Sequence, residues 1–179
     1  MTPTGHRTEV LILQHPMEVA QAKGSARLLQ LSLQCSEVLI GEAFGAALDA
    51  ALQGPHRNLL LFPEAGGDPG TGLKPPAPEA AEHLPPQPLR LVVLDGTWRK
   101  SRKMLALNPQ LQRLERLSLA APPVSRYLIR KAHEPHQLST LEATCMALSQ
   151  LEGADFAMQP LLDAFDGFVG EQLARLNPP

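Results

Sequence analysis

Aromatic side chains are scarce in this 179-residue chain, at 4 % of residues, with a single Trp and a single Tyr. The core must therefore be built from Leu, Val and Ala. Cysteine is almost absent: Cys35 and Cys145 imply neither a CxxC metal site nor a disulfide framework, which fits a reducing cytoplasm. Both fall in apolar helical patterns and are predicted to be buried thiols. No apolar run reaches 18 residues, so neither a signal peptide nor a membrane span is expected.

The motifs of the commonest catalytic sites are also missing. The chain contains no GxGxxG, GxxxxGK[ST], HExxH or GxSxG, which argues against the usual nucleotide cradles, zinc proteases and serine hydrolases. His15, His133 and His136 are too scattered for a metal site, and no metal is expected. The composition is that of an ordinary globular protein, and the length predicts one domain over residues 1–179.

Charge is distributed unevenly along the chain. Residues 97–136 contain nine Lys or Arg against two Glu, a balance of +7, whereas the remainder carries −9. A basic segment on an acidic body is typical of a local anionic partner such as RNA. A solvated helix face followed by a loop is the alternative explanation.

Short apolar runs alternate with helical patterns, which predicts an α/β fold with a mostly parallel sheet of about five strands flanked by helices. Strands are expected at residues 9–14, 37–40, 58–62, 89–94 and 116–119. Helices are expected at residues 25–34, 42–52, 97–107 and 139–151, and as one or two pieces bent at Pro160 over 154–176. Residues 63–88 contain eight prolines and are expected to form a long loop.

The fourth of these strands runs into the sequence Leu94, Asp95, Gly96, Thr97, Trp98. An acid at the carboxyl end of a buried parallel strand, beside a helix N-terminus, occupies the position where open α/β sheets bind ligands. Asp95 is also a candidate cap for the following helix, although Thr97 and Ser101 are available for that. Trp98 is either a core anchor or a stacking platform, and the core is favoured.

Around this stretch the chain carries further segments in a fixed order. LILQHPMEVAQAKGSARLLQLSL comes first, LDGTW follows, and NPQLQRL and SRYLIRKAHEPHQLSTLEA come later. In order and spacing these segments, over about residues 10–151, resemble the DTW-domain family. The resemblance implies a SPOUT-like fold with a C-terminal knot. It also implies transfer of a 3-amino-3-carboxypropyl group from S-adenosylmethionine to N3 of a uridine in tRNA, with methylthioadenosine released.

The resemblance also implies roles for matched residues. Asp95 would remove or orient the N3 proton, Arg130 would hold the methionine carboxylate, and Tyr127 with Ser125 would hold the amino-acid end or the uracil. Thr97 joins Asp95, Tyr127 and Arg130 as a catalytic candidate. Residues expected to line the cofactor site are Phe62, Pro63, Glu64, Leu94, Gly96, Ser125, Leu138, Ser139 and Thr140. Residues expected to meet RNA phosphates are Arg27, Arg99, Lys100, Arg102, Lys103 and Lys131.

Three alternatives stay open at this point: a SPOUT-like RNA methyltransferase, a non-catalytic RNA-binding module, and a small-molecule function in which the basic segment plays no part. Many members of the family begin with a cysteine-rich, zinc-binding segment that this sequence does not contain, so we expect a short form of the family or a trimmed chain. The oligomeric state is left open between a monomer and a homodimer.

Overall fold

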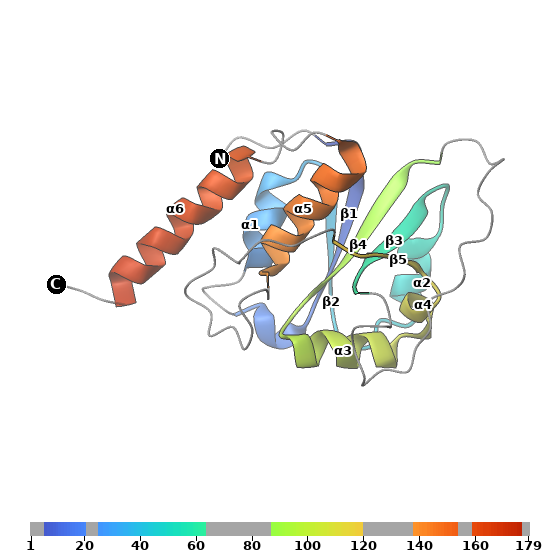
Figure 1. Ribbon diagram of the computed structural model, residues 1–179. Helices are drawn as coiled ribbons and strands as arrows, with labels where there is room; N and C mark the ends of the chain where they lie inside the picture. Colours follow the sequence, from blue (N-terminus) through green and yellow to red (C-terminus); the bar gives the residue numbers. More distant parts are fainter. Residues whose placement is uncertain (1–5, 21–24, 64–86, 120–137, 154–158, 177–179) are drawn as a thin grey trace.

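The computed structural model describes residues 6–20, 25–63, 87–119, 138–153 and 159–176. They form an α/β fold around one five-stranded sheet (Figure 1). All strand pairs are parallel and the strand order is β2-β1-β4-β3-β5. The strands are β1 Glu9–Gln14, β2 Ser36–Ile40, β3 Arg57–Leu61, β4 Leu89–Asp95 and β5 Glu115–Leu117. The predicted fold class and the five predicted strands are thus confirmed, with ends shifted by up to two residues.

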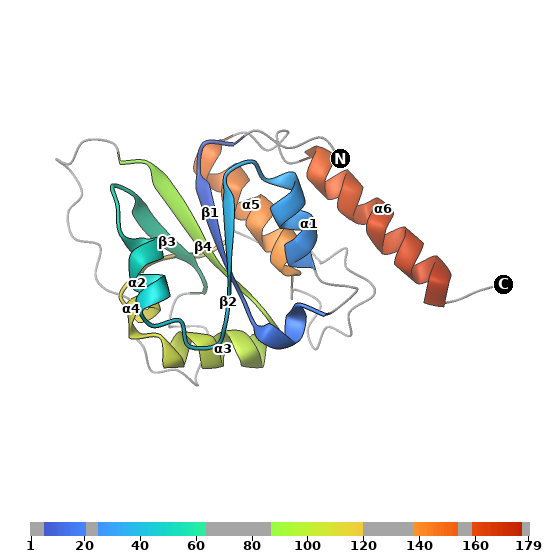
Figure 2. The same ribbon diagram turned by 180° about the vertical axis from the view of Figure 1, so that it is seen from behind.

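Both faces of the sheet are covered because the central strands are apolar on both sides. In β4, Leu91 and Val93 pack on one face, under helices α1 Ser25–Ser32, α5 Thr140–Glu152 and α6 Gln159–Leu176. Val92 and Leu94 pack on the other face, under α2 Ala46–Leu52, α3 Trp98–Leu107 and α4 Pro109–Gln112. Figures 1 and 2 show α1 and α5 on one side of the sheet, and α2 and α4 on the other.

The connections leave the two central strands in opposite directions. From β1 the chain passes through α1 to β2 at one edge, whereas from β4 it passes through α3 and α4 to β5 at the other edge. The boundary between β1 and β4 is therefore the topological switch point, and open α/β sheets bind ligands beside the carboxyl ends of the strands there. The register places Gln14 next to Asp95 at this position.

Two helices differ from the sequence expectation. The predicted helix over 42–52 begins only at Ala46, because the preceding segment is tied to the end of α3. The buried side chain of Asn108 accepts a hydrogen bond from the Phe44 amide at 2.9 Å and donates one to the Glu42 carbonyl at 2.8 Å. In α6, Pro160 lies in the first turn, where proline is tolerated, so the predicted bend does not occur in the described helix.

The prediction that both thiols are buried is wrong for one of them. Cys145 packs inside α5 and is 1 % exposed, whereas Cys35 lies exposed between α1 and β2. The sequence predicts burial of Cys35 from the apolar helical pattern before it, but α1 ends at Ser32, three residues before this cysteine. Among the described residues, no helix has the length and apolarity that a membrane crossing requires. The predicted C-terminal knot stays a prediction, because residues 120–137 and 154–158 lie outside the described part.

Candidate functional site

Asp95 is the last residue of β4 and is held from the neighbouring strand. Gln14 Nε2 donates a hydrogen bond to Asp95 Oδ2 at 3.0 Å, and the two side chains are both buried. The backbone amide of His15 donates to the Asp95 carbonyl at 3.0 Å, which continues the ladder one residue beyond the strand. The acid therefore sits at the switch point in an orientation fixed by β1.

Thr97, not Asp95, caps helix α3. The Thr97 Oγ1 accepts a hydrogen bond from the Lys100 amide at 3.4 Å, with Thr97 in extended backbone. The alternative in which Asp95 serves as the helix cap is thus wrong. The Asp95 carboxylate instead stands two residues before the helix, near the positive end of its dipole.

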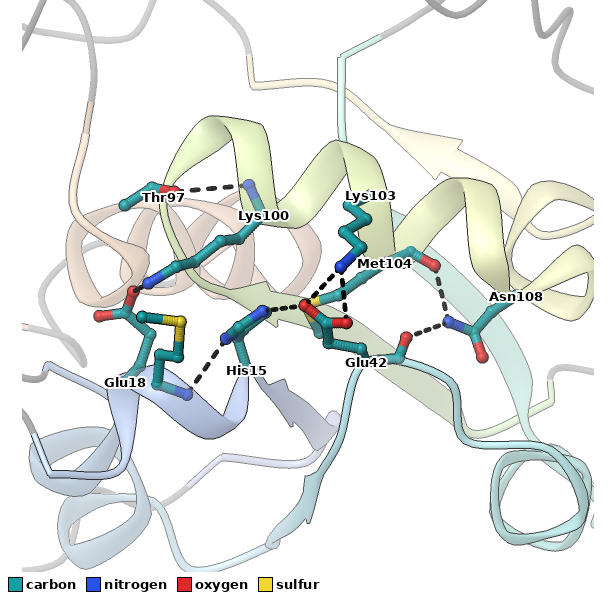
Figure 3. Close-up of polar contacts among 9 residues, drawn as sticks. His15, Glu18, Glu42, Thr97, Lys100, Lys103, Met104 and Asn108 are labelled. Carbon is teal, nitrogen blue, oxygen red and sulfur yellow. Dashed lines mark hydrogen bonds and ion pairs between the residues drawn. The ribbon is translucent and has the colours of Figure 1, made fainter.

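A buried histidine beside Asp95 joins the ends of β1 and β2 to α3 (Figure 3). The Met17 amide donates to His15 Nδ1 at 3.1 Å, so the proton of the ring lies on Nε2, which donates to Glu42 Oε1 at 2.5 Å. Lys103 Nζ contacts both oxygens of the same carboxylate, at 2.8 and 3.1 Å. Lys103 and His15 together hold the pKa of Glu42 below its usual value.

Gly96 lies where β4 turns into α3, and a side chain at this position would be tight against one neighbour. A Cβ there would lie 3.1 Å from Lys100 Cβ, so Lys100 would have to shift by a few tenths of an ångström. The distances of 3.6 Å to His15 Cβ and 3.7 Å to Ser101 Oγ are ordinary van der Waals contacts. The close packing of the strand end against α3 therefore favours glycine here, in addition to the ligand contact that the sequence predicts for it.

Trp98 forms an aromatic pair at the surface. Its ring stacks on Phe62, which directly follows β3, with centroids 5.0 Å apart and planes 12° from parallel. Phe62 is buried, but Trp98 is 37 % exposed. The favoured prediction of Trp98 as a core anchor is therefore wrong: it covers the core residue Phe62 and keeps part of its ring available to a ligand.

The basic residues of α3 are partly neutralised. Lys100 Nζ pairs with Glu18 Oε1 at 2.7 Å and Lys103 pairs with Glu42, as Figure 3 shows. Arg99 is exposed and Arg102 is half-buried on the same helix. Arg27 is exposed in the first turn of α1, the helix that follows β1.

Three of the residues expected to line the cofactor site, Leu138, Ser139 and Thr140, lie at the start of α5. Ser139 caps this helix: its Oγ accepts a hydrogen bond from the Glu142 amide at 3.2 Å, while the Glu142 carboxylate accepts one from the Ser139 amide at 2.7 Å. Leu138 and Thr140 on either side are half-buried. Several predicted site residues lie outside the described residues, and their roles stay predictions: Glu64, Ser125, Tyr127, Arg130 and Lys131.

The sequence interpretation missed part of this site. Besides Asp95, the carboxylates of Glu18 and Glu42 lie at the same edge, and the sequence analysis singles out neither. The signal is present in the sequence, since Gln14 ends the first strand, His15 and Glu18 follow it, and Glu42 follows the second strand. Parallel strands bring such residues to one edge. Among the described residues, no group of three His, Cys, Asp or Glu side chains is placed to hold a metal ion.

With this geometry in place, the chain was found to be similar to known proteins. The model of the DTW domain matches residues 1–173. A Drosophila melanogaster protein named tRNA-uridine aminocarboxypropyltransferase 2 is 32 % identical over 167 residues, which cover 89 % of this chain and 62 % of that protein. A Mus musculus protein of the same name is 29 % identical over 172 residues, or 93 % of this chain and 55 % of that protein. The chain thus spans little more than half of these relatives. No solved structure matches it.

Proposed function

The chain belongs to the DTW-domain family, and on that premise we propose that it transfers a 3-amino-3-carboxypropyl group from S-adenosylmethionine to N3 of a uridine in tRNA. Two relatives carry names that state a tRNA-uridine aminocarboxypropyltransferase activity. The donor and the nitrogen that accepts the group are part of our proposal. We also propose that the protein is located in the cytoplasm.

The observation that carries the proposal is the buried Asp95 at the switch point, oriented by Gln14. Uracil N3–H is a weak acid, and N3 becomes a nucleophile only as its proton leaves. A fixed carboxylate within hydrogen-bond reach of N3 serves as the general base. N3 then forms a bond to the methionine γ-carbon while the bond from that carbon to the sulfonium sulfur breaks. The electron pair stays on sulfur, methylthioadenosine leaves neutral, and Asp95 passes the proton to water.

Position decides which carbon reacts, because the sulfonium activates the methyl group and the γ-carbon alike. The protein must present the γ-carbon in line with N3 and keep the methyl group away from it. Residues around Asp95 fit this task. Gly96 brings the end of β4 close to α3, and Phe62 with Trp98 forms an aromatic wall beside it.

We assign tRNA binding to the exposed arginines near this edge, Arg27 and Arg99, together with Arg102 and Lys131. Lys100 and Lys103 contribute less than sequence alone suggests, because each has a carboxylate partner. Binding through phosphate contacts weakens as salt rises.

The deciding experiment incubates the protein with unmodified tRNA and S-adenosylmethionine and analyses the digested nucleosides by mass spectrometry. We expect aminocarboxypropyl-uridine and an equal amount of methylthioadenosine, and no product from Asp95→Asn. Adenosylhomocysteine with a methylated nucleoside would establish a methyltransferase instead. Retained tRNA binding without any product or cofactor binding would establish an RNA-binding module.

A further inference from the structure

Arg116, at the centre of β5, has unsatisfied hydrogen-bond donors. The residue is 9 % exposed, and its Nη1 donates to the Pro63 carbonyl at 2.9 Å. Its Nε and Nη2 are shut off from solvent and make no hydrogen bond with any described residue. A buried donor without a partner is destabilising, and a buried cation without a counter-charge more so. Burial lowers the pKa of Arg116, but a guanidinium stays protonated in proteins.

The two unsatisfied donors are the pair that binds a carboxylate side-on. In the same sheet, Arg90 uses Nε and Nη2 to hold Glu9, at 3.0 and 2.8 Å. Arg57 uses the same two atoms to hold Glu115, the residue before Arg116, at 2.9 and 2.6 Å. We call the Nε and Nη2 donors of an arginine its fork. Of the three arginines, Arg116 is the one whose fork has no carboxylate partner among the described residues. Bidentate arginine–carboxylate pairs are strong and geometrically selective.

The position of Arg116 points toward the ligand edge. The register pairs Arg116 with Leu60, one residue before the end of β3, so Arg116 lies on the face that Leu60 shares with α3. Its guanidinium lies over the ring of Phe62, 5.3 Å from the centroid, and Phe62 in turn stacks on Trp98. Phe62, Trp98 and the Pro63 carbonyl therefore brace a guanidinium beside the wall that we assign to the donor site.

We propose that Arg116 binds the α-carboxylate of the methionine part of S-adenosylmethionine, through Nε and Nη2. This inference rests on the proposed function and gives Arg116 the role that the sequence predicts for Arg130. A terminal carboxylate suits the site better than an RNA phosphate, because donors closed off from solvent admit a small end group more readily than a polynucleotide backbone. The carboxylate reaches them through a local rearrangement of the atoms that now cover the fork.

The test compares three ligands by calorimetry: S-adenosylmethionine, its decarboxylated analogue, and methylthioadenosine, which lacks the whole amino-acid chain. The wild-type protein should bind S-adenosylmethionine roughly tenfold to a hundredfold more tightly than the decarboxylated analogue. Arg116→Lys keeps the charge but loses the fork, so the preference should fall to within about threefold. Its affinity for methylthioadenosine should stay unchanged. Arg57→Lys, on the adjacent strand, is the matched control and should keep the full preference.

Four outcomes would overturn the inference. Equal affinity of the wild type for both ligands would show that no side chain selects the carboxylate. A full preference in Arg116→Lys, or its loss only in Arg130→Lys, would assign the carboxylate elsewhere. An equal loss of affinity for methylthioadenosine in Arg116→Lys would indicate that Arg116 has a structural role. Weakening of tRNA binding alone would identify a phosphate site. If Arg116→Lys does not fold, the same binding preference is measured in Arg116→Gln and Arg130→Lys, and the variant that loses it identifies the arginine that binds the carboxylate.

Failure of the proposed function gives a different pattern. In that case the wild type forms no aminocarboxypropyl-uridine and no methylthioadenosine from unmodified tRNA, whatever its affinity for S-adenosylmethionine. A wild type that forms the product but keeps its carboxylate preference in Arg116→Lys overturns the role of Arg116 and leaves the proposed function intact.

Discussion

The hydrogen bond between Gln14 and Asp95 joins β1 to β4, although the two residues are 81 positions apart in the chain. A carboxylate at a strand end has several rotamers available, and a hydrogen bond from one side reduces them. Gln14 supplies that bond from the next strand, where the parallel register places it level with Asp95. Its role is to position the acid, since it is Asp95 that we propose to contact the uridine.

Replacing Gln14 with Met removes the donor and keeps the length of the side chain. We expect kcat to fall roughly tenfold to a hundredfold, the worth of a hydrogen bond to a charged group, while KM for S-adenosylmethionine stays within about twofold. Steady-state kinetics of methylthioadenosine release measure both constants. Gln53→Met, at an exposed position, is the control. A rise in KM with unchanged kcat would contradict a positioning role.

The two thiols differ in environment and should differ in reactivity. Burial, with a smaller contribution from Glu142, raises the pKa of Cys145 to about 12, whereas Cys35 is exposed. Because the thiolate is the reactive form, a thiol reagent at pH 8 should label one cysteine per chain in the native protein and two after denaturation. Mass spectrometry of the labelled peptides identifies the site. Rapid native labelling of Cys145 would contradict the described packing of α5.

At the scale of elements, α3 is fixed to the sheet at both ends. Thr97 caps its start, and Asn108 at its end hydrogen-bonds the Met104 carbonyl and the segment before α2. Between them Lys103 pairs with Glu42, which also contacts His15, and this ties the helix to the ends of β1 and β2. The helix that follows Asp95 is therefore held against the same strand ends that orient the acid.

The stabilisation of the fold by Glu42 should depend on pH. The pKa of Glu42 is lower in the folded chain than its ordinary 4.5, so its ionised form stabilises the fold. That contribution is complete above pH 4.5 and is lost as the pH falls through the lowered value. Urea unfolding should therefore find Glu42→Gln less stable than wild type at pH 7 and nearly equal to it in acid. Glu37→Gln, an exposed carboxylate on β2, is the control. A deficit that persists in acid would contradict the ionic role.

On the scale of the whole molecule, the sheet divides the core into two apolar layers. One layer lies under α1, α5 and α6. The other lies under α2, α3 and α4 and contains Phe62, over whose ring the guanidinium of Arg116 lies. The polar carboxyl edge between them gathers residues from β1, β2 and β4.

The ion pair between Lys103 and Glu42 at that edge should reduce the contribution of Lys103 to the salt dependence of tRNA binding. Arg99 is exposed, so Arg99→Gln should lower the slope of log affinity against log salt by about 1. Lys103→Gln should change the slope less, because Glu42 already neutralises this lysine. Filter binding over a range of salt measures both slopes. Equal effects of the two substitutions would show that the pair with Glu42 opens when tRNA binds.

The sequence by itself determined the elements and their class. Short apolar runs such as residues 91–94, which are buried in β4, predict strands, and capping residues such as Ser139 mark element ends through local geometry. The strand-end position of Asp95 could be predicted for the same reason, since it depends on neighbours in the chain. The late start of α2 could not, because Asn108, more than sixty residues away, holds the preceding segment.

Only the tertiary structure decided which residues meet at the carboxyl edge. The strand order brings Gln14 to Asp95, and the layer of helices brings Trp98 onto Phe62 and Lys103 onto Glu42. Burial of Arg116 with an unsatisfied fork likewise depends on β3, Phe62 and Pro63 closing around one side chain of β5. Such contacts join segments that are distant in the chain, and local periodicity alone does not determine which strands become neighbours in the sheet.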